Sequence, residues 1–463
     1  MRSTFFGLEA ARKGLLAHQK MIDVTGHNIA NANTPGYSRQ VAIAATTEPF
    51  TEPTMNRVET AGQIGTGVDI KSILRIRDAF TDLQIRAENH TYGKWEARQE
   101  ILSQLEMIVG EPSDTNSLRN TLDVFWQSLQ ELAKRPEEQA VRSTVRQQGI
   151  ILAETIRHTY TQMQDLMINI EAEIKVGVDH INSIAYRIAA LNERIGKIVA
   201  IGDEPNDLLD QRDYLIDELS KLVDINIVED HQRKAQITIG GKSLVIADKV
   251  NEIHTDINVS SGLSLKWPDW TEVFVKNGKV KGFLEVREDD IPYLLEKLDE
   301  FANTLIHSFN TVHRAGIGLD GSTNIDFFAG STARDIQVHN DIILDLRKIA
   351  ASRSGAPGDG DNALAMADLK HQRVLSSNTA TFADFIGGIV SKIGVDSSRA
   401  QSMLDNQKVL LSHLENRRES YSGVSIDEEM AEMIRFQHGF NAAAKVIATV
   451  DEMLEVIVKG LKV

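Results

Sequence analysis

The end of the chain carries an apolar repeat that constrains the fold more than any other feature of the sequence. Apolar side chains recur there every seven residues, and a second set follows three positions after the first four. These positions are Met433, Phe436, Phe440, Ala443, Ile447, Val450, Leu454, Ile457 and Leu461. A heptad pattern of this kind is typical of a helix that buries one stripe against a second helix. Ser425 and Glu428 form a capping-box sequence, which predicts that the helix begins between them.

A weaker repeat with the same period lies at the N-terminus and offers a candidate partner. Its apolar positions are Leu8, Leu15, Ile22 and Ile29, and its companion positions are small or polar. Neither helix is expected to be stable alone, because most helical stability comes from burying an apolar face. We therefore expect residues 1–80, an axial helix followed by an extended segment, to pair with an axial helix in residues 423–463. The alternative, in which each stripe packs onto a local core, remains open.

Between the ends the composition changes twice. Residues 81–222 and 288–422 have helical patterns and predict a rod-like body, whereas residues 223–287 alternate like short strands and predict an inserted β-rich domain. No proline interrupts residues 137–200, although three glycines leave open whether that helix is continuous. The expected fold is mainly α, with an inserted small β domain, paired coiled-coil-like terminal helices and a long helical-bundle body.

Local turn signals refine this picture. Gly240-Gly241 separates two alternating apolar runs and predicts a β-hairpin, and Asn277-Gly278 predicts a second hairpin between residues 272–275 and 280–286. Asp290 followed by Pro292 predicts the cap and first turn of the next helix.

The overall composition excludes several classes of protein. The formal net charge is −16, which argues against binding to nucleic acid or to anionic membranes. Cysteine is absent, so disulfides, thiolate nucleophiles and thiolate zinc sites are excluded. No run reaches the ~18 apolar residues of a membrane span. The N-terminus has neither the apolar region nor the cleavage site of a secretory signal, so these features alone indicate a cytosolic protein.

Candidate catalytic and metal-binding patterns have simpler explanations. Asp320, Ser322, Asn324 and Asp326 alternate as in a calcium loop, but the sixth and twelfth positions do not fit, and turn formation explains them better. The acidic pair Asp210 and Asp213 is interpreted as helix surface near Arg212. We therefore expect no enzyme activity, no cofactor and no metal.

Several stretches resemble a known family. Residues 28–37, with the sequence NIANANTPGY, resemble the N-terminal signature of the flagellar rod, hook and hook-associated axial proteins. Pro35-Gly36 fits the centre of a type II turn, so the first helix is expected to end there. Residues 205–213, 428–431 and 449–454 resemble the hook-associated protein 1 (FlgK-type) family, and the resemblance extends over nearly the whole chain.

The resemblance implies a structural junction protein of the bacterial flagellum. Such proteins are exported unfolded through the type III apparatus without a cleaved signal, which replaces the cytosolic expectation with an extracellular one. They form a ring at the distal end of the hook, between the hook protein and the second junction protein. A small cytosolic chaperone holds their C-terminal helix before export.

Two sets of residues are then expected to form interfaces. The C-terminal repeat would serve assembly and chaperone binding. The N-terminal assembly interface would comprise Leu8, Leu15, Ile22, Ile29, Asn31, Pro35, Gly36 and Tyr37. The alternatives are a hook or rod component and, less favoured, an exported hydrolase. The hydrolase would need a concave pocket with converging carboxylates in residues 223–287.

Overall fold

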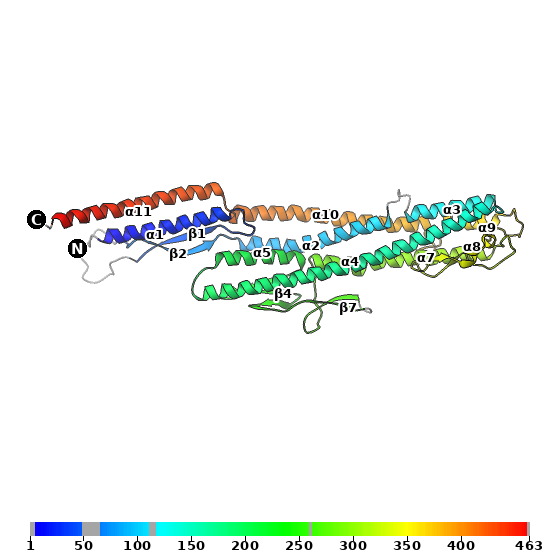
Figure 1. Cartoon of the computed structure of the whole chain (residues 1–463), viewed down its shortest axis with the longest axis horizontal. Helices are drawn as coiled ribbons and strands as arrows, with labels where there is room; N and C mark the ends of the chain where they lie inside the picture. Colours follow the sequence, from blue (N-terminus) through cyan, green and yellow to red (C-terminus); the bar gives the residue numbers. More distant parts are fainter. Residues whose placement is uncertain (1–4, 49–64, 111–116, 259–261, 461–463) are drawn as a thin grey trace.

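The computed structural model describes residues 5–48, 65–110, 117–258 and 262–460. The molecule is elongated, and its first and last helices, α1 and α11, lie side by side at one end (Figure 1). A long helical body forms the rest, with the small β region along one side of it (Figure 1). The predicted mainly helical fold with paired terminal helices is confirmed.

The terminal end consists of two helices and a β-ribbon. Helix α1 (Phe5–Asn31) runs antiparallel to α11 (Ile426–Gly460), since Gly26 approaches Met433 whereas His18 approaches Phe436 and Gly439. Helix α11 is the longer of the two and continues past the start of α1 (Figure 1). The ribbon pairs β1 (Gln40–Thr46) with β2 (Val68–Arg75) in antiparallel register and lies against α1.

Helices of 17 to 62 residues make up most of the body. They are α2 (Ala79–Val109), α3 (Leu118–Lys134), α4 (Gln139–Ala200), α5 (Asn206–Leu222), α7 (Ile291–Arg314) and α10 (Phe382–Ser422). Helix α4 is continuous despite its glycines. Gly149 and Gly196 lie where the side chains of Phe327 and Lys234 fill the space that a Cβ would need. These glycines therefore permit close packing and do not break the helix.

Short elements and an aromatic core close the end of the body farthest from the termini. The elements are β9 (Phe328–Ala329), β10 (Gln337–Val338), α8 (Asn340–Leu344), η2 (Leu346–Lys348), α9 (Asp361–Asp368) and η3 (Leu369–His371). Their core contains the fully buried rings of Phe125, Phe309 and Phe327, whose centroids lie 5.0–5.9 Å apart.

The β region shares its core with the helices. A four-stranded antiparallel sheet has the order β3 (Asn226–Glu229), β4 (Ala235–Ile239), β5 (Lys242–Ile246) and β6 (Lys249–Val250), and β7 (His254–Asn258) pairs separately with β8 (Gly262–Lys266). The hairpin predicted around Gly240-Gly241 is present. Ile237 and Leu244 are buried in the same apolar cluster as Ile184 and Ile188 of α4, so the sheet covers α4 and has no separate core.

The second predicted hairpin is wrong. Gly278 does have a positive φ of +98°, but it begins helix α6 (Lys279–Glu285), which passes through a π-helical turn, η1 (Val286–Asp290), into α7. Val280, Phe283 and Val286 are buried at three-residue spacing, which is a helical and not a strand period. The β region therefore ends before residue 279 and does not extend to 287.

Asp290 also differs from its prediction. It makes no side-chain capping bond, because the helix is already continuous through this position. Its carboxylate instead accepts a hydrogen bond from Arg98 Nη2 on α2 at 2.9 Å.

Candidate functional site: the junction between the terminal helices and the body

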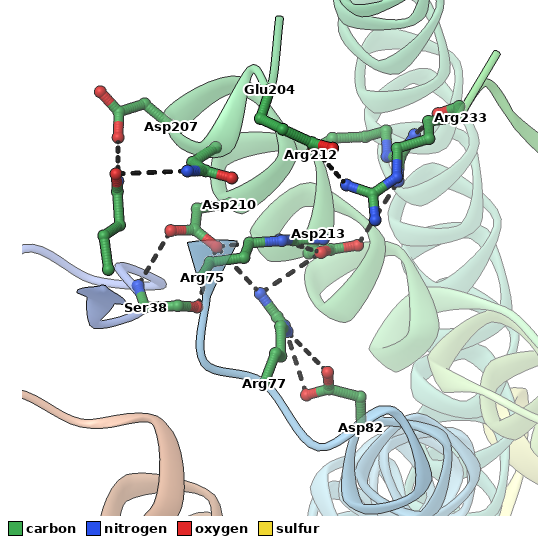
Figure 2. Close-up of polar contacts among 12 residues, drawn as sticks. Ser38, Arg75, Arg77, Asp82, Glu204, Asp207, Asp210, Arg212, Asp213 and Arg233 are labelled. Carbon is green, nitrogen blue, oxygen red and sulfur yellow. Dashed lines mark hydrogen bonds and ion pairs between the residues drawn. The ribbon is translucent and has the colours of Figure 1, made fainter. Parts of the chain in front are cut away.

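Three passages of the chain lie where the terminal end meets the body, and all three contact α5 or its partners. Residues 38–40 follow α1 and enter β1, residues 75–78 lead from β2 into α2, and residues 418–422 are the last turn of α10 before α11. Figure 2 shows Ser38, Arg75 and Arg77 from the first two passages converging on the carboxylates of α5. The terminal end and the body are thus joined at α5.

Helix α5 presents one polar and one apolar face. Its apolar residues, which include Leu209, Ile216 and Leu219, are buried in the core of the body. The polar positions on the other side are spaced three or four residues apart, so they form a single stripe. We call this stripe of Asn206, Asp210, Asp213 and Asp217 the acidic stripe, because three of its four residues are aspartates.

The N-terminal half of the acidic stripe, Asn206 and Asp210, binds the β-ribbon. Asn206 Nδ2 donates to the carbonyl oxygen of Ile73 at 2.8 Å. Asp210 accepts from the backbone N–H of Ser38 at 2.9 Å and from its hydroxyl at 2.8 Å. Arg75 Nη1 donates to the same carboxylate at 2.9 Å. Strand β2 and the residues that lead into β1 are thus attached to α5 close to where the ribbon meets the body.

The C-terminal half of the acidic stripe, Asp213 and Asp217, contacts the two long body helices that reach the terminal end. Asp213 lies 2.7 Å from Arg75 Nη1, 3.3 Å from Arg77 Nη1 and 3.3 Å from Arg86 Nη2. Asp217 accepts from Arg86 Nε and from Arg418 Nη1, each at 2.7 Å. Helices α2 and α10 therefore share one set of carboxylates.

The two central carboxylates respond in opposite ways to their surroundings. Burial alone would raise the pKa of Asp213, but the charges of Arg77, Arg75 and Arg86 outweigh it and lower the pKa to about 2. At Asp210 burial dominates, so its pKa is raised despite Arg75 and the hydrogen bonds from Ser38. The charge of Asp213 therefore stabilises the junction, whereas the charge of Asp210 is costly to bury.

Asp210 and Asp213 are buried, so their interpretation as helix surface near Arg212 is wrong, and Arg212 itself belongs to the opposite side of α5. Its side chain is fully buried and donates to the carbonyl oxygen of Arg233 and to the carboxylate of Glu229 (Figure 2 shows Arg212 beside Arg233). Helix α5 therefore lies between the terminal passages, which contact one side of it, and the β region, which contacts the other.

A second buried cluster ties α11 to the segment that follows α1. Glu429, only 2% exposed, accepts from Asn28 Nδ2 at 2.9 Å and from Arg39 Nε at 2.7 Å. Asn28 Oδ1 in turn accepts from the hydroxyl of Tyr37 at 2.8 Å and from the backbone N–H of Gln40 at 3.0 Å. Burial, with the nearby carboxylates, raises the pKa of Tyr37, so its hydroxyl stays protonated and donates.

The turn predicted at Pro35-Gly36 is present and lies against the body. Gly36 has φ +78°, as the third position of a type II turn requires, and Tyr37 N–H donates to the carbonyl oxygen of Thr34 at 3.1 Å. A Cβ on Gly36 would lie 2.9 Å from Cβ of Tyr214 on α5. Asn31 Nδ2 donates within α1 to the carbonyl oxygen of His27. Of the expected interface residues, Gly36 therefore has an intramolecular contact with the body.

The two apolar stripes are only half covered. Leu8, Leu15, Ile22 and Ile29 are half-buried, and so are the C-terminal positions from Met433 to Leu454. Ile457 is 47% exposed because it lies on the part of α11 that continues past α1, and Leu461 lies outside the described residues. The most buried residues of α1 are instead Ala17, Val24, Thr25 and Asn28.

Sequence reasoning missed the residues that join the two parts. Arg75 and Arg418 lie in no recognised motif, and the resemblance of residues 428–431 did not indicate what Glu429 would contact. The available signal was the spacing of Asn206, Asp210, Asp213 and Asp217, which marks one acidic helix face but does not identify its partners.

The enzymatic alternatives find no support in the part of the chain that the structure describes. A recess beside β5, of about 310 Å³, contains one carboxylate, Asp269, and Lys242 Nζ binds it at 2.7 Å. Asp320 accepts from the backbone and hydroxyl of Ser322, as in an ordinary Asx turn. Among the described residues, no three His, Asp or Glu side chains are grouped to hold a metal ion. None of the described helices is long and apolar enough to cross a bilayer.

Comparisons with known proteins agree along the whole chain. Residues 102–328 match the model of the flagellar hook-associated protein FlgK helical domain. Residues 417–459 match the C-terminal model of the flagellar basal body rod FlgEFG proteins, and residues 8–37 match the flagella basal body rod protein model. The two terminal matches cover the helices that pair in the structure.

Full-length relatives give the same result. Flagellar hook-associated protein 1 of Bacillus subtilis is 33% identical and the alignment covers 100% of this chain and 99% of that protein. The Escherichia coli protein of the same name is 25% identical, with coverage of 97% and 98%. A solved structure of the flagellar hook junction protein FlgK from Burkholderia pseudomallei has a similar fold, with a TM-score of 0.67 at 15% identity, over 73% of this chain and 100% of that one.

Proposed function

This chain belongs to the flagellar hook-associated protein 1 family, and from that premise we propose that it forms a ring at the distal end of the hook and joins the hook to the filament. The family is structural and not enzymatic. In this proposal the hook protein lies on one side of the ring and the second junction protein lies on the other.

The observation that carries the proposal is the incomplete cover of the terminal helices. Among the described residues, helices α1 and α11 and one two-stranded ribbon make up this end of the molecule, and the described apolar stripes stay half-exposed. Beyond α1, Val456 is 71% exposed and Ile457 47% exposed. Large exposed apolar surfaces mark interaction sites, so neighbouring subunits are the natural cover for these stripes.

Assembly would then be coupled to ordering of the terminal helices. Fixing a residue's backbone costs roughly 1–2 kcal/mol, and two helices with half-covered stripes recover only part of that cost. Burial against neighbours at the growing tip supplies the rest. Subunits would thus stay monomeric before export and polymerise afterwards.

The junction at α5 gives the proposal its mechanical element. Terminal helices held in a ring must transmit load to the body, and the described connections pass through Asp210, Asp213 and Asp217. Their arginine partners come from β2, α2 and α10. Because these pairs are largely buried, water screens them less than it screens surface pairs.

Export without a cleaved signal and a cytosolic chaperone at the C-terminal stripe complete the proposal. The chaperone would cover Met433, Phe440 and Ile447 before assembly, because an exposed apolar helix is an aggregation hazard.

The alternative of a hook or rod component is less favoured. The terminal matches are shared with rod proteins, but the match over residues 102–328 is to the FlgK helical domain. No observation favours an exported hydrolase.

Electron microscopy of cells that lack this protein tests the proposal. We expect hooks without filaments and flagellin released into the medium, and restoration when the gene is supplied again. Filaments attached normally in the deletion strain would contradict it. Hydrogen exchange on the dilute monomer tests the coupled ordering separately. We expect residues 5–30 and 430–460 to be measurably but weakly protected, and protection as strong as that of the body helices would contradict that step alone.

A further inference from the structure

We infer that His18, seated on Gly439, fixes the register and close approach of α1 and α11 in the half of the pair remote from the body. This inference rests on the packing of the two helices and is independent of what the molecule assembles with. It makes His18 a positioning residue that determines which faces of the pair remain available.

The apolar stripes cannot fix the register by themselves. Both repeat every seven residues, so sliding one helix by a heptad, about 10.5 Å at 1.5 Å per residue, again places apolar side chains opposite each other. Helix pairs of this kind need a feature that does not repeat, such as a polar contact or an unusually close approach.

One non-repeating feature lies next to the body. Asn28 and Glu429 are 1% and 2% exposed, and Asn28 Nδ2 donates to Glu429 Oε2 at 2.9 Å. This contact anchors the near end of the pair. The helices continue for several turns beyond it, and the near anchor does not set the spacing there.

The second non-repeating feature is the contact between His18 and Gly439. A Cβ built on Gly439 would lie 2.5 Å from Cε1, 2.6 Å from Nε2 and 2.9 Å from Nδ1 of the imidazole. The ring also lies beside Phe436, with centroids 6.4 Å apart, and its Nδ1 is buried. The imidazole therefore occupies the space that any other residue at position 439 would fill.

The other glycines of the pair show that this contact is specific. Gly7 and Gly14 have no atom within 4 Å of a built Cβ, and Gly26 meets only the terminal methyl of Met433 at 3.9 Å. A slip of one heptad would place His18 opposite Glu432 or Val446, which both carry side chains. Among the described positions, the imidazole thus fits one register.

A double-mutant cycle in the purified full-length chain tests this. Replacing glycine by alanine inside a helix raises the equilibrium constant for helix formation by up to about fivefold, so a Gly→Ala change normally stabilises a helix. With His18 present, we expect Gly439→Ala to lower the hydrogen-exchange protection of residues 440–450 by about tenfold, through the clash with the ring. In the His18→Ala background, we expect the same change to raise protection.

Gly14→Ala is the matched control, because its Cβ meets open space, and it should raise protection in both backgrounds. Exchange protection of the backbone around Glu429 reports whether the near end stays paired. Unchanged protection there in the Gly439→Ala chain, with protection lost only farther along α11, supports the inference. If Gly439→Ala raises protection in both backgrounds, or lowers it in both, the inference is wrong.

Discussion

Replacing Asp213 by asparagine should destabilise this protein much more than replacing Asp210, although the two carboxylates lie three residues apart on the same helix. Asp213 is surrounded by three arginines at 2.7–3.3 Å, so its neutral substitute removes the one carboxylate that contacts all three of them. Asp210 is buried with a raised pKa, and asparagine would still accept the backbone hydrogen bond of Ser38.

The pKa of Asp213 gives the expected magnitude. A lowering from 3.8 to about 2 corresponds to roughly 2.5 kcal/mol of stabilisation at neutral pH. We therefore expect Asp213→Asn to lower the free energy of unfolding by about 2.5 kcal/mol at pH 7, and Asp210→Asn to change it by less than about 1 kcal/mol.

The pH dependence provides a sharper test. Because the pKa of Asp213 is lower in the folded than in the unfolded protein, its contribution is present above about pH 4 and is lost as the pH falls to about 2. The raised pKa of Asp210 has the opposite sign, so protonation of Asp210 favours the folded protein.

Urea unfolding followed by circular dichroism, at a series of pH values from 7 to 2, measures both effects. Hydrogen exchange of α5 shows whether the loss is local to the junction. Equal destabilisation by the two substitutions, or an Asp213→Asn loss that persists at pH 2, would refute the assignment of Asp213 as the stabilising counter-ion.

Three further outcomes are expected. Phe440→Asp combined with Ile447→Asp should abolish incorporation into flagella, seen by immunogold labelling, while circular dichroism shows the body still folded; normal incorporation would mean that the C-terminal stripe is not an interface. Gly36→Ala should lower the free energy of unfolding by about 1–3 kcal/mol, because the backbone has φ +78° and Tyr214 of α5 lies 2.9 Å from the new Cβ. The control is Gly388→Ala on α10, whose Cβ meets open space and which should not lower the free energy of unfolding. Arg212→Ala should cost about 2–3 kcal/mol in urea unfolding and reduce the exchange protection of β3 and β4, since the carbonyl oxygen of Arg233 and the carboxylate of Glu229 lose their buried donor. Unchanged protection there would argue against a role of Arg212 in holding the sheet.

The sequence alone determined the elements whose signals are local. The heptads at both ends and the Gly240-Gly241 hairpin depend on periodicity or turn chemistry within a few residues, and each produced the expected element. The sequence left open whether the proline-free run of α4 is one helix, and the structure shows that it is. The Asn277-Gly278 prediction was wrong because a glycine with positive φ can begin a helix as well as turn a hairpin. A Cβ on Gly278 would lie 2.6 Å from the carbonyl oxygen of Leu222 and from Cα of Val223, and this close approach depends on tertiary packing.

Only the tertiary structure decided which charges meet. The acidic stripe of α5 is visible in the sequence, but its partners lie far along the chain: Arg75 is 135 positions from Asp210, and Arg418 is 201 positions from Asp217. With 50 basic and 66 acidic residues, spacing cannot select these pairs. Periodicity fixes which face of a helix is polar or apolar, whereas the path of the chain fixes what that face touches, and the path is set by the packing of the whole body.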